Sequence, residues 1–105
     1  MEKLDEGIEM KVLCSLDNLS VDLIYVQPNA VESCVYHKQL DEVLYILNGR
    51  IEVILDGEKK IYEEGECVAI SKMTRHVIKN IGQSLARILA ICSPKYTSED
   101  SYICK

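Results

Sequence analysis

Residues 41–57 read DEVLYILNGRIEVILDG, and this stretch decides the fold. It contains two apolar runs of strand length, residues 42–47 and 51–55, rich in valine, isoleucine, leucine and tyrosine. Asn48-Gly49 separates the two runs, and Asp56-Gly57 follows the second. Both pairs tolerate the positive φ angles of tight hairpin turns. The stretch therefore predicts consecutive β-strands joined by hairpins.

The rest of the chain carries similar short apolar segments, separated by turn residues at intervals of about 8 to 12 residues. Residues 85–92 are apolar on every face, but Gly82 before them and Ser93-Pro94 after them favour a buried strand over a helix. The expected strands are residues 10–13, 21–26, 31–37, 42–47, 51–55, 59–62, 67–70, 76–80 and 85–93. Strands at this spacing predict an all-β fold, either a sandwich or a barrel.

The length and charge of the chain exclude several classes of protein. We expect residues 1–105 to form one domain, with a core over 21–93 and a C-terminal tail over 94–105. No apolar run reaches the length of a membrane span, and the net charge of −5 argues against nucleic acid as a partner. Residues 1–10 include four acidic residues and no signal-peptide core, so we expect a cytoplasmic protein.

The five cysteines are odd in number and include no C-x-x-C pair. In the reducing cytosol we expect no disulfide, and most of these side chains should pack as small hydrophobes. Cys104 lies in the expected tail and is a candidate exposed thiol. The five positions are Cys14, Cys34, Cys67, Cys92 and Cys104.

The only two histidines, His37 and His76, lie in expected strands within two spaced patterns. In the first, four residues separate His37 from Glu42 and six separate Glu42 from Gly49. In the second, ten residues separate Gly65 from His76 and three separate His76 from Asn80. These intervals resemble the two sequence motifs of the cupin family, and the resemblance extends over about residues 21–93. It implies a single-domain jelly-roll barrel (a double-stranded β-helix) made of two antiparallel sheets.

Three positions depart from the family's motifs. Val35 stands where the first motif has its first histidine, Ser71 where the second motif has proline, and Met73 where it has glycine. Residues two apart on a strand share a face, so Val35 should point the same way as His37. Met73 either narrows the mouth of the barrel or covers a loop.

The resemblance implies that His37, Glu42 and His76 bind one divalent metal inside the barrel. Two imidazoles and a carboxylate with open positions suit iron, manganese, nickel or zinc. Such a site can support isomerisation, decarboxylation or oxygen activation on a small molecule. Gln39 shares the parity of His37 and is a candidate fourth ligand, although only two residues then precede Glu42. No nucleotide or flavin cofactor is expected.

A non-catalytic alternative remains open, because Val35 removes one ligand from the implied set. In that case the barrel is a metal-free module that binds a sugar or a small acid, with both histidines hydrogen-bonding the ligand. The family hosts many activities on one fold, so the resemblance does not choose between the two functions.

Quaternary structure can also be anticipated from the pattern. Val43, Tyr45 and Leu47 alternate with Glu42 and should lie on the outer face of their sheet. An apolar outer face needs a cover, and small members of the family are commonly dimers. We therefore expect a homodimer.

Overall fold

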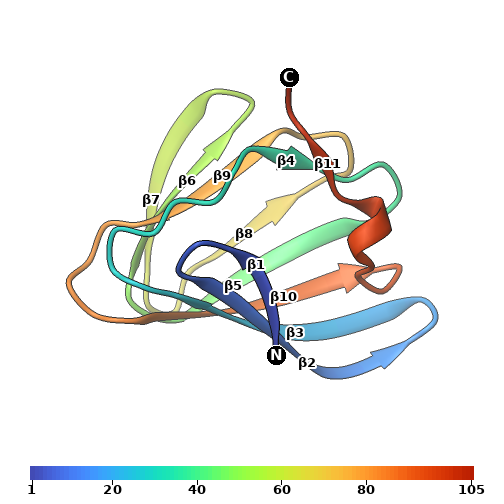
Figure 1. Cartoon of the computed structure of the whole chain (residues 1–105), viewed down its shortest axis with the longest axis horizontal. Helices are drawn as coiled ribbons and strands as arrows, with labels where there is room; N and C mark the ends of the chain where they lie inside the picture. The colour runs from blue at the N-terminus through green and yellow to red at the C-terminus, as the bar shows by residue number, and fades with distance from the viewer.

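The computed structural model describes all residues from 1 to 105 and consists of two antiparallel β-sheets that face each other (Figure 1). One sheet has six strands in the order β1-β2-β3-β10-β5-β8, and the other has five in the order β11-β4-β9-β6-β7. The first sheet comprises β1 (Glu2–Asp5), β2 (Ile8–Leu16), β3 (Leu19–Val26), β10 (Ala86–Ser93), β5 (Asp41–Asn48) and β8 (Cys67–Ile70). The second comprises β11 (Tyr102–Ile103), β4 (Val35–Tyr36), β9 (His76–Asn80), β6 (Arg50–Leu55) and β7 (Glu58–Glu63). The predicted all-β jelly roll is confirmed, although no strand pairing joins the two sheets into a closed barrel.

The two glycine-containing pairs in residues 41–57 have different roles. Asp56 and Gly57 have φ angles of 48° and 86° and close the hairpin between β6 and β7, as predicted. Asn48-Gly49 forms no hairpin, because β5 pairs with β8 and β10 whereas β6 pairs with β7 and β9. The chain crosses there from one sheet to the other, and Gly49 has a φ of 109°. A Cβ atom at this position would lie 2.6 Å from the Cβ of Ala86, so only glycine fits.

The predicted strand over residues 31–37 is largely wrong. Only Val35–Tyr36 forms a strand, and Val31 makes a single bridge to Lys79. The intervening loop is held by individual contacts, such as the Glu32 N–H donating to the carbonyl of Ile78. Charged and small polar residues in this segment weaken the two-residue alternation that a longer strand requires.

The C-terminal tail folds back onto the second sheet. A short 3₁₀ helix, η1 (Ser98–Asp100), leads into β11, in which Tyr102 pairs with Tyr36 of β4. Cys104 forms a disulfide with Cys34, so the expectation of no disulfide, and of a free thiol at Cys104, is wrong. The two residues are 70 positions apart, and β4–β11 pairing brings their backbones together. The sequence spacing could not show that contact.

The hydrophobic core fills the space between the two sheets. Buried side chains alternate along the central strands with side chains that face outward, for example Ile51 and Val53 of β6 against Glu52. Six polar or charged residues are also buried: Ser20, Asp22, His37, Glu42, His76 and Asn80. Five of these lie toward one end of the two sheets, where they surround or support a cavity. Asn80 has a structural role, because it donates to the carbonyls of Val26 and Ser84 and accepts from the Gly82 N–H.

The helical content is a single turn, η1, which is far shorter than a membrane-spanning helix.

Candidate metal centre

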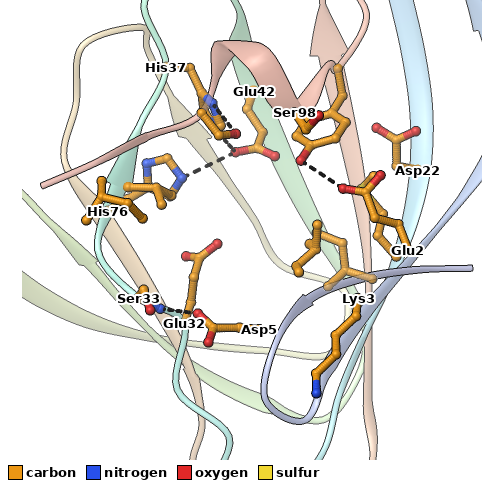
Figure 2. A pocket seen from close by; sticks show the side chains of 17 residues that line it. Glu2, Lys3, Asp5, Asp22, Glu32, Ser33, His37, Glu42, His76 and Ser98 are labelled. Carbon is orange, nitrogen blue, oxygen red and sulfur yellow. Dashed lines mark hydrogen bonds and ion pairs between the residues drawn. The ribbon is translucent and has the colours of Figure 1, made fainter.

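His37, Glu42 and His76 meet at one point between the sheets (Figure 2). Glu42 comes from β5 of the six-stranded sheet, His76 begins β9 of the opposite sheet, and His37 follows β4. Their candidate ligand atoms lie within 4.8 Å of one another, and all three residues are buried. Glu42 Oε1 is 3.9 Å from Nε2 of His37 and 3.8 Å from Nε2 of His76.

A hydrogen bond at Nδ1 of each imidazole orients the ring so that Nε2 faces Glu42. His37 Nδ1 lies 2.9 Å from the carbonyl oxygen of Asp100, and His76 Nδ1 lies 3.0 Å from that of Thr74. A carbonyl only accepts hydrogen bonds, so each Nδ1 carries the proton and each neutral ring keeps a lone pair on Nε2. This arrangement, with the second ring nitrogen held by a carbonyl, is typical of metal-ligating histidines.

Burial sets the protonation states in the cluster. Loss of solvation lowers the pKa of His76 to about 4, against the weaker opposing effect of its bond to Thr74. His76 is therefore neutral near pH 7, and its contact with Glu42 is not an ion pair. Burial also raises the pKa of Glu42, and the nearby His37 opposes that rise.

Cys92 lies beneath Glu42 in the neighbouring strand β10. Its Sγ is 3.7 Å from Glu42 Oε2, and the two residues are paired in the β5–β10 register. The thiol is fully buried, and burial raises its pKa far above the usual range. It stays protonated and donates its S–H to the carboxylate, leaving Oε1 toward the two histidines.

Val35 faces the same side as His37, as the two-residue spacing on a strand predicts. It is paired with His76 in the β4–β9 register and lines the same cavity as His37. Gln39 is exposed and is not among the residues that line the cavity. Its backbone N–H instead donates to the Asp100 carboxylate.

The backbone conformation of Met73 explains why the second motif described above has glycine at this position. Its φ is 69°, in the left-handed region, and its N–H donates to the carbonyl of His37 at 2.6 Å. The side chain is 57% exposed and does not line the cavity, so it does not narrow the mouth of the cavity.

The cavity beside the histidines has a volume of about 310 Å³ and is rich in acidic groups. Sequence reasoning missed Asp22, Glu32 and Tyr96, which line the cavity, and Asp100, which supports His37. Asp22 lies in an apolar run of β3, where a buried charged residue is itself an unusual signal. Nothing in the local sequence pointed to Glu32 or to the two tail residues.

Two antiparallel sheets face each other, and a cluster of histidines and a carboxylate points into the space between them. These features identify the protein as a small jelly-roll protein. The chain belongs to the cupin family, since residues 22–92 match the family model described as a cupin domain. A protein of Aquifex aeolicus is 35% identical over 91% of this chain and 77% of its own length. The pectin degradation protein KdgF of Dickeya dadantii is 26% identical over 90% of this chain and 84% of its own length. The structure of KdgF from a Halomonas species superposes with a TM-score of 0.85 at 21% identity, covering 93% of this chain and 88% of that one, which shows the shared fold.

Proposed function

We propose that this protein binds one divalent transition metal through His37, Glu42 and His76 and binds a small molecule in the adjoining cavity. The observation that supports the metal is the convergence of two Nε2 lone pairs on one carboxylate oxygen, at 3.8 and 3.9 Å. Metal–ligand bonds are about 2.0–2.2 Å, so these donors need only a small inward movement to share an ion. Two nitrogens and one oxygen suit iron, manganese, nickel or zinc.

A bound ion would supply a Lewis acid with open coordination positions for water or substrate. Isomerisation, decarboxylation and oxygenase-type reactions use such a centre. The residues of this chain have distinct parts: Asp100 and Thr74 orient the two imidazoles, and Cys92 holds one oxygen of Glu42. The position of Val35 beside His76 leaves one side of the cluster without a protein ligand.

The test is elemental analysis of untagged protein loaded in turn with iron, manganese, nickel and zinc. We expect near-stoichiometric binding of one of these metals, lost in His76→Ala and in Glu42→Gln. Arg75→Ala is the matched control, because the Arg75 side chain is adjacent in sequence but exposed and outside the cavity. Absence of metal under every loading condition would overturn the metal assignment.

A metal-free binding module is the second candidate, and the apolar Val35 opposite His76 favours it. In this case the cavity holds a sugar or a small acid directly. Ligand binding would then raise the melting temperature equally with and without chelator, because only the folded state binds the ligand. A rise that chelator abolishes would support the metal-dependent function instead.

We also propose that the protein is a homodimer formed through the outer face of the six-stranded sheet. Val43, Ile91 and Val21 are paired across β5, β10 and β3, so they form an apolar row on that face. Tyr45 in the next row is 39% exposed. Light scattering should give twice the chain mass, and Ile91→Lys should give a folded monomer. Glu52→Lys on the other sheet is the control, and a monomeric wild-type protein would refute the assembly.

A further inference from the structure

The cavity is lined by several carboxylates without a matching cation. Glu2, Asp5, Asp22 and Glu32 line it together with Glu42, and Lys3 is the only basic residue among the lining residues apart from the histidines. The Lys3 ammonium pairs with Glu6 at 3.0 Å on an exposed surface, and Figure 2 shows it pointing away from Glu32 and Glu42. It therefore does not neutralise the interior of the cavity.

Asp22 is the cavity residue whose hydrogen bonding is incomplete. It is fully buried on β3, and one carboxylate oxygen accepts a hydrogen bond from the Ser20 hydroxyl at 3.0 Å. The other oxygen, Oδ1, has no hydrogen-bond partner in the protein. An unpaired buried carboxylate oxygen is unfavourable, and such groups usually have a partner when the site is filled.

Glu32 faces the same space from the loop before β4. One of its oxygens accepts from the Ile78 N–H at 3.2 Å, and Figure 2 shows its carboxylate directed toward the interior of the cavity. Burial and the nearby Glu42 both hold its pKa well above the usual range. Burial likewise raises the pKa of Asp22. The ionised forms of both groups thus lack a counter-charge, and a positively charged ligand would supply it.

We propose that Asp22 and Glu32, which lie on opposite sides of the cavity in Figure 2, each form a subsite for a protonated amine of a small ligand, so that the cavity takes amines and excludes carboxylates and phosphates. A primary ammonium donates three hydrogen bonds, and bonds between charged partners are the stronger kind. The volume of about 310 Å³ accommodates a molecule of several carbon atoms. An anion would meet several carboxylates in a low-dielectric space and gain nothing from them.

This inference rests on the proposed small-molecule cavity but does not require the metal. The test uses three probes of one chain length that differ at their ends: putrescine (1,4-diaminobutane), 1,4-butanediol and succinate. Binding is measured by calorimetry on the full chain in the presence of chelator. We expect putrescine to bind at least tenfold more tightly than 1,4-butanediol, and succinate not to bind.

Asp22→Asn and Glu32→Gln keep the size of each side chain and remove its charge, so both should reduce the preference for putrescine. Glu9→Gln is the matched control, since Glu9 is exposed on β2 outside the cavity and should leave the preference unchanged. If Asp22→Asn fails to fold, Glu32→Gln alone still tests the subsite. Equal binding of all three probes, or an unchanged preference in a folded Glu32→Gln variant, would overturn this inference and leave the small-molecule cavity standing. Binding of none of them would overturn this inference alone, because the metal-loading and chelator experiments described above decide the proposed function separately.

Discussion

The backbone carbonyl of Asp100 lies 2.9 Å from Nδ1 of His37, although the two residues are 63 positions apart in the chain. The side chain of Asp100 also accepts hydrogen bonds from the backbone N–H groups of Lys38, Gln39 and Leu40. One tail residue thus orients a candidate ligand and holds the loop that follows it. Such supporting contacts commonly affect metal affinity by about 10- to 100-fold.

Replacing the Asp100 side chain should therefore weaken the metal site without removing any ligand. In Asp100→Ala we expect metal affinity to fall about tenfold, because the loop after His37 loses three hydrogen bonds and the ring is less well held. Competition with a metal-sensitive dye measures the affinity. Asp17→Ala is the control, since the Asp17 side chain is exposed and makes only a 4.0 Å contact with Lys95. Unchanged affinity in a folded Asp100→Ala variant would contradict this role for the tail.

Reduction of the Cys34–Cys104 disulfide should also weaken metal binding, and it should lower the stability of the fold. Cys34–Cys104 ties the end of the tail beside β4, so breaking it frees the segment that carries Asp100. A disulfide that closes a long loop stabilises a protein by about 2–4 kcal/mol. We expect a loss of that order, with weaker metal binding, on adding a thiol reductant or in Cys34→Ser/Cys104→Ser. Cys14→Ser, which changes an exposed free thiol, should do neither. Five reactive thiols in the unfolded, unreduced chain would show that the bond does not form.

Adding a fourth ligand, which would be a third nitrogen, next to His76 should strengthen the site. Val35 is paired with His76 across β4 and β9 and lines the cavity, so a histidine there can reach the same ion. We expect Val35→His to bind metal at least tenfold more tightly, with a new nitrogen ligand visible by X-ray absorption spectroscopy. Val35→Leu controls for the change in size. If Val35→His matches the wild type, position 35 does not face the ion.

Relief of backbone strain at Met73 should stabilise the fold. Its φ of 69° costs a non-glycine residue about 1 kcal/mol, and glycine adopts the same conformation without that cost. Part of the gain is offset by the greater freedom of glycine in the unfolded chain. We expect Met73→Gly to raise the free energy of unfolding by about 0.5 kcal/mol in urea titrations. Met73→Ala keeps the strain and should give no increase; an equal increase in both variants would point to the exposed side chain instead.

The buried neutral His76 should make the metal-free protein less stable in mild acid. Its folded pKa of about 4 lies below the unfolded value of 6.5, so the unfolded chain binds the extra proton first. The contribution of His76 to stability is present above pH 6.5 and falls as the pH drops toward 4, by about 3 kcal/mol at most. The raised pKa values of Glu42, Glu32 and Asp22 act in the opposite direction.

Comparison with His76→Gln isolates the histidine contribution, since the carboxyl groups are present in both proteins. Urea titrations between pH 4 and 7 should show a difference between the two proteins that grows with pH. A difference that is constant with pH would mean that His76 titrates normally in the folded state.

The sequence alone was sufficient to predict most of the strands, and its resemblance to the cupin motifs predicted the candidate ligands. Alternation with a period of two reports which residues face inward, and this signal lies within each strand. The residues Val43 to Leu47 and the pair Asp56-Gly57 behave as that local pattern predicts. The family motif added the spacing that relates His37 to Glu42 and His76.

Only the tertiary structure decided how distant segments meet. Asn48-Gly49 looks like a hairpin locally, but hydrogen-bond partners elsewhere in the chain send β5 and β6 to different sheets. The contact of Asp100 with His37, the Cys34–Cys104 bond and the unpaired oxygen of Asp22 all depend on side chains brought together from far apart in sequence. The physical reason is that turn propensity and alternation are properties of neighbouring residues, whereas pairing, burial and a cavity lining are properties of the packed sheets as a whole.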